Sequence, residues 1–318
     1  MLGSGVAIAA GLVAYAAVDR QMALAAITRK NALASLQGKQ ALIVGGSNGI
    51  GKGIAVRLAQ AGCSVTVMGR SPEAMRVAVE EMRRVCPDKQ ARFDSIATDA
   101  TEFASVRASA RRFADEHPGA LDILVTSQGA ASMKGFTPNA DGVDNKLALH
   151  YFGRVLFWRE LYPLMHKSSS PRLLTVLSAG VHAPYADYES DFALEKGFSL
   201  QKAADAAGFY NDLAVDAMTR EHPRLFAVHA APGLIATNYG AGLPFPLPAL
   251  FSVAKLFANS IESCAEFMCD PLLSDSAPAG TFLLMDAKAQ PALKTKLHTD
   301  RAVDFVWAQT KRILGPHG

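Results

Sequence analysis

Short apolar runs alternate with amphipathic stretches along most of this chain. The runs are rich in branched side chains and bounded by glycine, proline or charged residues, as buried strands of a parallel sheet are. In the stretches between them apolar residues recur every three or four positions, which indicates helices packed by one face. The predicted strands are Gln40–Val44, Ser64–Met68, Ala91–Thr98, Leu121–Val125, Arg172–Leu177, Leu225–Ala230 and Thr281–Met285.

The predicted helices alternate with these strands. Such alternation predicts βαβ units, hence an α/β fold with a doubly wound parallel sheet, the Rossmann fold. No repeat or low-complexity linker interrupts it, so residues 38–318 are predicted to form one domain behind a separate hydrophobic N-terminal helix, residues 1–37. The predicted helices of the domain are Gly49–Ala61, Pro72–Val85, Thr101–Glu116, Val143–Met165, Leu200–Arg220 and Asp300–Leu314.

The N-terminal segment is apolar without being strongly hydrophobic. Leu2–Val18 carries no charge, and much of it is alanine and glycine. As a helix it would span about 26 Å, slightly less than the ~30 Å hydrocarbon core of a bilayer. Three interpretations remain open: a membrane anchor, a cleaved targeting segment, or a helix packed on a partner. Because the positive charges follow the apolar run, an anchor predicts a main domain on the cytoplasmic or mitochondrial matrix side.

Composition and charge exclude several classes of function. The 318 residues are 50% hydrophobic and 19% charged, which excludes a disordered chain. With 32 basic and 29 acidic residues, the net charge of +3 is too small for a nucleic-acid-binding surface. The 4 cysteines contain no CxxC pair and the 8 histidines no HExxH motif, so neither a disulfide framework nor a metal site is predicted.

A glycine-rich turn follows the first predicted strand. Residues 44–51 read VGGSNGIG and lead directly into a helix, with the glycine spacing G-x-x-x-G-x-G. Such a turn lets the backbone approach a pyrophosphate, and the free N–H groups of the helix N-terminus face the anion. The residues predicted to hold a dinucleotide here are Gly45, Ser47, Asn48, Gly49, Ile50 and Gly51.

The end of the second predicted strand bears on the choice of dinucleotide. It reads Met68-Gly69-Arg70-Ser71, where a site selective for NAD usually has an acidic residue for the ribose 2′-hydroxyl. Arg70 can instead pair with a 2′-phosphate, which favours NADP(H) over NAD(H). The alternative is an ordinary solvent-exposed arginine at the start of a helix.

Further segments carry a resemblance to a known family. Asp99 follows the third strand, and residues 124–129 (LVTSQG) run from the end of the fourth strand into the loop after it. Ser178 follows the fifth strand, and residues 232–237 (PGLIAT) the sixth. With the glycine turn they resemble the short-chain dehydrogenase/reductase family over residues 38–315. The resemblance implies that Ser178 is catalytic and that Asp99 contacts the adenine. It implies further cofactor contacts from Gly129, and a hold on the nicotinamide carboxamide from Pro232, Gly233 and Thr237.

The resemblance also implies a catalytic tyrosine with a lysine four residues later, whose ammonium lowers the pKa of the phenol and binds the ribose of the cofactor. The aligned segment is Phe198-Ser199-Leu200-Gln201-Lys202, which keeps the lysine and lacks the phenol. His150 stands where the family has an asparagine, and is either a proton relay or a structural histidine. Other candidate proton donors are Tyr185, Tyr188 and Tyr210, none of which has a lysine four residues later.

Two functions from different classes remain open. Residues 243–251 read LPFPLPALF where the family has its substrate lid, which indicates a hydrophobic small molecule or a membrane lipid, or else a packed or partner-docking loop. The first function is a membrane-associated NADP(H)-dependent oxidoreductase acting on a hydrophobic carbonyl or alcohol, as a homodimer or tetramer. The second is a catalytically impaired nucleotide-binding accessory subunit of a membrane complex, for example in mitochondria.

Overall fold

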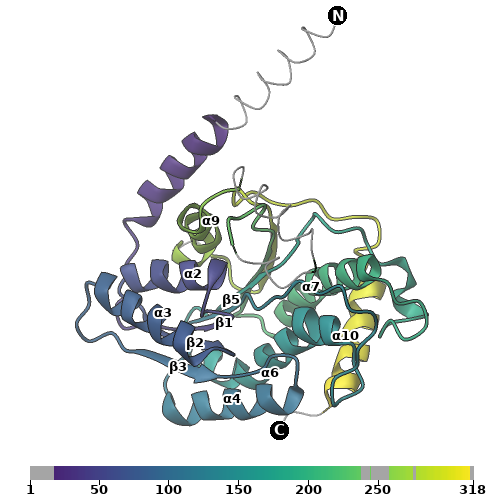
Figure 1. Ribbon diagram of the computed structural model, residues 1–318. Coiled ribbons are helices and arrows are strands. Elements are labelled where there is room, and N and C mark those ends of the chain that lie inside the picture. Colours follow the sequence, from purple (N-terminus) through teal and green to yellow (C-terminus); the bar gives the residue numbers. More distant parts are fainter. Residues whose placement is uncertain (1–17, 238–243, 245–257, 275–276, 316–318) are drawn as a thin grey trace, which may run out of the picture.

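The computed structural model describes residues 18–237, 244, 258–274 and 277–315. Within them a parallel sheet of seven strands has the order β3-β2-β1-β4-β5-β6-β7 (Figure 1). The chain reverses its direction of winding between β1 and β4, and ligands of such sheets bind beyond the carboxyl ends of the strands near this point. The strands are β1 (Gln40–Val44), β2 (Ser64–Gly69), β3 (Phe93–Ala97), β4 (Ile123–Thr126), β5 (Arg172–Val176), β6 (Phe226–Ala230) and β7 (Thr281–Met285).

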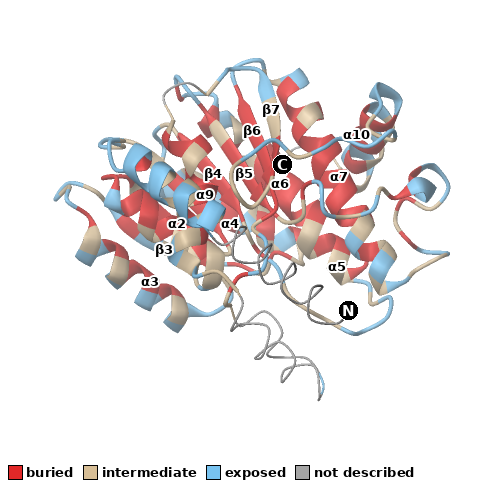
Figure 2. Ribbon diagram, turned by 90° about the horizontal axis from the view of Figure 1, so that it is seen from above, coloured by how far each residue is buried: buried red, intermediate tan, exposed pale blue. Residues whose placement is uncertain are grey.

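Helices cover both faces of the sheet, and each face has its own apolar core. Because successive side chains of a strand point to opposite faces, Ile43 of β1 packs in one core and Leu42 in the other. Figure 2 shows the strands and the sheet-facing sides of the helices buried. The helices on one face are α2 (Gly49–Gln60), α3 (Pro72–Val85) and α9 (Ile261–Leu273), and those on the other are α4 (Phe103–Glu116), α6 (Gly153–Met165), α7 (Leu200–Glu221) and α10 (Asp300–Leu314).

The predicted α/β fold is confirmed, with differences at particular elements. The predicted helix Val143–Met165 begins later and is not regular. A short α5 (Asn145–Leu147) and a π-helical segment η1 (Ala148–Phe152) precede α6, and the Asp144 carboxylate caps α5 by accepting from the Lys146 N–H at 2.9 Å. Helix α9 and the short 3₁₀ segment η2 (Ala186–Glu189) were not predicted.

Residues 18–31 form a helix that packs on the domain near α9 (Figure 1). Asn31 donates to the Glu266 carboxylate at 2.8 Å, and Lys30 pairs with Asp270 at 2.7 Å. Among the helices of residues 18–315 that the structure describes, none is both long and apolar enough to cross a bilayer. The apolar run Leu2–Val18 lies outside the described residues except for Val18, as does the lid segment 243–251 except for Pro244.

Candidate active site

The glycine turn after β1 is closely packed. Gly45 has a φ of +82° and Gly49 a φ of +55°, a backbone region that favours glycine. A Cβ at Gly45 would lie within 3.0 Å of the Gln128 backbone, and one at Gly51 within 3.0 Å of the Ser127 hydroxyl. The turn therefore fits tightly against the residues that follow β4, and larger residues would force it away from them.

The N-terminus of α2 opens directly from this turn. Its N-cap residue, Asn48, makes no side-chain hydrogen bond to the N–H groups of the first turn, so these donors are available to an anion. Thr237, from the segment after β6, lies beside the turn, because a Cβ at Gly49 would be 3.3 Å from the Thr237 methyl group. The structure thus brings together the glycine turn and residues 232–237, two segments that were predicted to hold one cofactor.

The other predicted cofactor residues follow carboxyl ends of strands and so lie at the same edge of the sheet. Arg70 is exposed directly after β2, and its guanidinium has no hydrogen bond or ion pair with any residue that the structure describes. Asp99 follows β3, and its Oδ1 accepts from the Thr101 N–H at 3.0 Å and hydroxyl at 2.7 Å. Gly129 is exposed shortly after β4.

A dinucleotide fits the donors and the space at this edge. The glycines leave backbone where side chains would otherwise stand, and Arg70 is an exposed cation. Gln128 adds an amide that is only 7% exposed, and neither its oxygen nor its nitrogen has a hydrogen-bond partner among the described residues. An unpaired buried amide is costly, and the polar groups of a ligand would satisfy it.

Ser178 lies after β5, at the same edge. Its N–H donates to His229 Nε2 at 3.2 Å, and its hydroxyl oxygen lies 3.4 Å from His182 Nδ1. Gly208 of α7 faces both groups, because a Cβ there would lie within 3.0 Å of the Ser178 hydroxyl and of the His182 ring. The missing side chain at Gly208 therefore makes room for an imidazole beside Ser178.

Behind His182 lies the carboxylate of Asp212, which is 1% exposed. It contacts His182 Nε2 at 3.2 Å, His229 Nδ1 at 2.5 Å and His298 Nε2 at 3.0 Å. Burial opposes a charge on Asp212, but the charge and hydrogen bonds of the histidines outweigh it and hold its pKa well below the usual value. Burial also opposes a charge on His182, yet the hydrogen bond and charge of Asp212 raise the pKa of His182 above its usual value.

His150 lies in η1 and is held on both sides. Its Nε2 accepts from the Ala130 N–H at 3.3 Å, and its carbonyl oxygen accepts from Asn211 Nδ2 at 2.8 Å. Burial, with the neighbouring charges of Arg154 and Lys146, lowers the pKa of His150 to about 3. At neutral pH His150 is therefore an uncharged acceptor that supports the loop after β4.

Comparison with known proteins bears on the family of this chain. A family model described as short chain dehydrogenase matches residues 39–192, which include the glycine turn and Ser178. An oxidoreductase of Emericella nidulans is 29% identical over 215 residues, and a short-chain dehydrogenase of Penicillium roqueforti is 28% identical over 213 residues. Residues 39–192 of this chain thus match the short-chain dehydrogenase family.

The similarity to these relatives covers them unequally. It spans 67% of this chain and 63% of the Emericella protein, less than two thirds of that relative, and 63% of this chain and 80% of the Penicillium protein. A crystal structure of a short-chain dehydrogenase from Burkholderia cenocepacia, in complex with NADP, is 22% identical with a TM-score of 0.59. That match covers 80% of this chain and 98% of the other chain, and confirms the fold.

Phe198 and Lys202 contact groups other than Ser178. The Phe198 ring packs edge-on against Phe136, with ring centroids 5.8 Å apart. The Lys202 ammonium pairs with Asp187 at 2.9 Å, and the side chains of this ion pair are both half-exposed. Lys202 precedes Gly208, the α7 residue against Ser178, by about 9 Å along the helix axis. The described contacts therefore do not bring the predicted Phe198–Lys202 pair to Ser178.

The three candidate tyrosines donate to groups elsewhere. The hydroxyl of Tyr185 donates to the Asp191 carbonyl at 3.0 Å, and burial, with nearby acidic residues, raises the pKa of Tyr185 to about 12. The hydroxyl of Tyr210 donates to the Phe192 carbonyl at 3.0 Å. Burial likewise raises the pKa of both Tyr188 and Tyr210. A raised pKa is the opposite of what a general acid near neutral pH requires.

Sequence reasoning missed the cluster around Asp212. One signal was present: an acidic residue stands between Tyr210 and Leu213 on a helix that is apolar on that side, and a buried carboxylate needs partners. The partners themselves come from three separate segments and only the fold brings them together. They are His182 after β5, His229 in β6 and His298 before α10.

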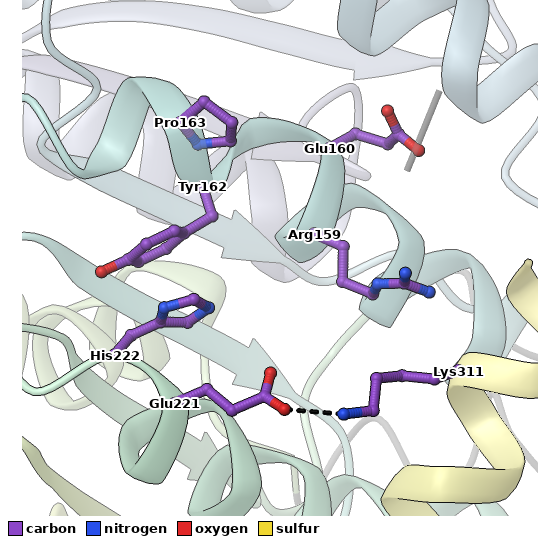
Figure 3. A pocket seen from close by; sticks show the side chains of 7 residues that line it. All are labelled: Arg159, Glu160, Tyr162, Pro163, Glu221, His222 and Lys311. Atoms are coloured by element: carbon purple, nitrogen blue, oxygen red, sulfur yellow. Dashed lines mark hydrogen bonds and ion pairs between the residues drawn. The ribbon is translucent and has the colours of Figure 1, made fainter. Parts of the chain in front are cut away.

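A separate hollow of about 190 Å³ lies between the C-terminal ends of α6 and α7 and the helix α10 (Figure 3). Within it Glu221 pairs with Lys311 at 2.7 Å, and the Tyr162 ring stacks on His222 with centroids 3.4 Å apart. Helices of a parallel sheet begin near the carboxyl ends of the strands and end near their amino ends. The hollow is therefore at the opposite end of the sheet from Ser178 and is not part of the candidate site.

Proposed function

We propose that this short-chain dehydrogenase binds a nicotinamide dinucleotide and transfers hydride between it and a hydrophobic carbonyl or alcohol. One observation carries the proposal: the glycine turn with its uncapped helix N-terminus, and Ser178 with its buried hydrogen-bonded cluster, lie at the same edge of the sheet. Family membership supports the nicotinamide cofactor. The apolar sequence of residues 243–251 supports the hydrophobic substrate.

Each group has a role in this proposal. The N–H groups at the start of α2 bind the pyrophosphate, and Asp99 binds the adenine. The segment Pro232, Gly233 and Thr237 orients the nicotinamide, which when bound supplies or accepts the hydride. The Ser178 hydroxyl donates a hydrogen bond to the substrate oxygen and so stabilises the negative charge that develops there.

The test is cofactor binding and turnover measured on one preparation of the full chain. We expect NADPH to bind, as followed by its fluorescence, and to be oxidised in the presence of decanal or acetophenone. Binding without turnover of either carbonyl, together with migration of the protein in a large membrane complex on a native gel, would instead support the accessory-subunit role. Migration as a dimer or tetramer would support the enzyme.

We propose that the site prefers NADP(H), because Arg70 is exposed without a partner in the described chain where the 2′-phosphate of the adenosine ribose would lie. Arg70→Ala is expected to weaken NADPH binding by about 1–3 kcal/mol, roughly 5- to 150-fold, and to leave NADH binding unchanged. Titration calorimetry with both cofactors measures this. Arg84→Ala, which removes another exposed arginine from α3, is the matched control, and equal losses for NADPH and NADH would contradict the preference.

We propose further that residues 1–17 attach the protein to a membrane, with the main domain on the cytoplasmic or matrix side. The uncharged sequence of Leu2–Val18 supports this. Because the helix 18–31 is fastened to α9 by Asn31 and Lys30, a chain lacking only residues 1–17 should keep its fold. We expect the full chain to sediment with membranes and the shortened chain to remain in the supernatant. Equal fractionation of the two would contradict the attachment.

A further inference from the structure

The hydrogen-bond partners of the three histidines determine which nitrogens carry hydrogen. His229 Nε2 accepts from the Ser178 N–H, so its hydrogen is on Nδ1, which donates to Asp212. His298 Nδ1 accepts from the Thr295 N–H at 2.9 Å, so its hydrogen is on Nε2, which also donates to Asp212. Both rings are therefore neutral in this arrangement.

His182 differs from the other two histidines. Its Nδ1 lies 2.7 Å from the Ser178 carbonyl oxygen and its Nε2 lies 3.2 Å from the Asp212 carboxylate, and both of these oxygens accept. An imidazolium, with hydrogen on both nitrogens, satisfies both contacts and pairs with the Asp212 carboxylate. The cluster holds one proton beyond its neutral tautomers, and that proton is on the ring that adjoins the Ser178 hydroxyl.

We infer that His182 is the proton source of this site. It delivers its Nδ1 proton to the hydroxyl oxygen of Ser178, and the Ser178 hydroxyl delivers its own proton to the substrate oxygen. The inference rests on the proposed hydride transfer. A bound nicotinamide cofactor would supply the hydride for the new C–H bond. The carbonyl π pair becomes the O–H bond with the Ser178 proton, and the serine oxygen takes the His182 proton. His182 is left neutral and regains a proton from solvent, so charge and atoms balance.

Asp212 and Gly208 position this relay. Asp212 holds the charged form of His182 through Nε2, and Gly208 leaves the space in which the ring lies 3.4 Å from the Ser178 hydroxyl oxygen. The other titratable groups that face the ring are Asp205 of α7 and His229 of β6, with His298 on the far side of the carboxylate. Asp205 and Asp212 are negative while His229 and His298 are neutral, so the surroundings favour the imidazolium.

The same geometry argues against two other uses of the cluster. A serine nucleophile needs a neutral base that can take its proton, whereas both nitrogens of His182 already donate. A metal ion needs lone pairs aimed at one point, whereas the imidazole N–H groups are directed into the Asp212 carboxylate, and no metal-binding group occurs among the described residues.

The first test is His182→Ala, with decanal and NADPH as the probes. We expect reduction to fall by about 10²- to 10⁴-fold and NADPH affinity to stay unchanged. Added imidazole, which fits the space that the ring leaves, should restore part of the rate. Reduction by the wild type should fall as pH rises through the His182 pKa, and this falling limb should vanish in the variant without imidazole.

The outcomes separate this inference from the proposed function. The relay would be overturned if His182→Ala reduced decanal as fast as the wild type, or if its rate still fell as pH rises. Turnover by the wild type would in that case still support the proposed dehydrogenase function. Absence of NADPH binding by the wild type would overturn both. A readout without cofactor is the ¹⁵N NMR spectrum of the histidine rings at pH 6. The His182 signals are assigned as those that are missing from the spectrum of the folded His182→Gln variant. Two protonated nitrogens on His182 support the relay. A single protonated nitrogen there overturns it.

Discussion

Asp212→Ala is expected to lower the free energy of unfolding by about 3–5 kcal/mol, because it leaves the buried imidazoles of His182, His229 and His298 without their shared acceptor. Denaturant unfolding followed by the fluorescence of Trp158, which is fully buried, measures the loss. Asp187→Ala is the matched control: it removes a half-exposed ion pair with Lys202 and should cost no more than about 1 kcal/mol. Equal losses in the two variants would contradict the role of the cluster.

The loss in Asp212→Ala should also depend on pH. The pKa of Asp212 lies below its ordinary value, so its contribution to stability is present above about pH 4 and is lost as pH falls through the folded pKa. The pKa of His182 lies above its ordinary value, so its contribution is present below about pH 6.5 and is lost as pH rises through the folded pKa. The difference between wild type and variant is therefore expected to be largest near pH 5–6 and smaller near pH 9. A difference independent of pH would contradict the ion pair.

The sheet could be predicted from the sequence because its strands are buried on both sides. A strand such as Gln40–Val44 must be apolar throughout, and the glycine turn marks its end. The start of the Val143–Met165 helix could not be predicted, because the Asp144 cap and the π-helical segment depend on the 3D surroundings of the loop. Helix α9 was not predicted because Pro271, a residue type that usually ends a helix, lies within it.

The cofactor edge and the acid–base groups differ in how far sequence reveals them. Gly45, Gly49 and Gly51 form a local motif whose spacing already requires a tight turn, and a turn needs no distant partner. The proton donor has no local motif. The alignment of Phe198 and Lys202 with a tyrosine–lysine pair used their spacing, whereas the structure places Gly208 against Ser178 and Asp212 four residues later. Gly208 and Asp212 are thus four residues apart, as a tyrosine–lysine pair would be, but their residue types differ. A search by spacing for a tyrosine and a lysine therefore does not find them.

Gly208→Ala is expected to reduce carbonyl reduction by about 10²- to 10⁴-fold while leaving NADPH binding unchanged. The added Cβ would lie within 3.0 Å of both the Ser178 hydroxyl and the His182 ring. One of these groups must therefore move from its present position, in which His229 holds Ser178 and the Asp212 carboxylate holds His182. Alanine favours a helix over glycine by about 1 kcal/mol, so the variant should lose activity rather than its fold. Steady-state kinetics beside a denaturation curve distinguish the two.

A double-mutant cycle identifies what the Cβ displaces. If Gly208→Ala acts by moving the His182 ring away from Ser178, it should cost almost nothing further in a His182→Ala background, since the ring is already gone. Two independent losses that multiply would instead mean that the Cβ acts on Ser178 alone. Imidazole should rescue His182→Ala but not the double variant, because the methyl group introduced by Gly208→Ala would occupy part of the space that the added imidazole needs.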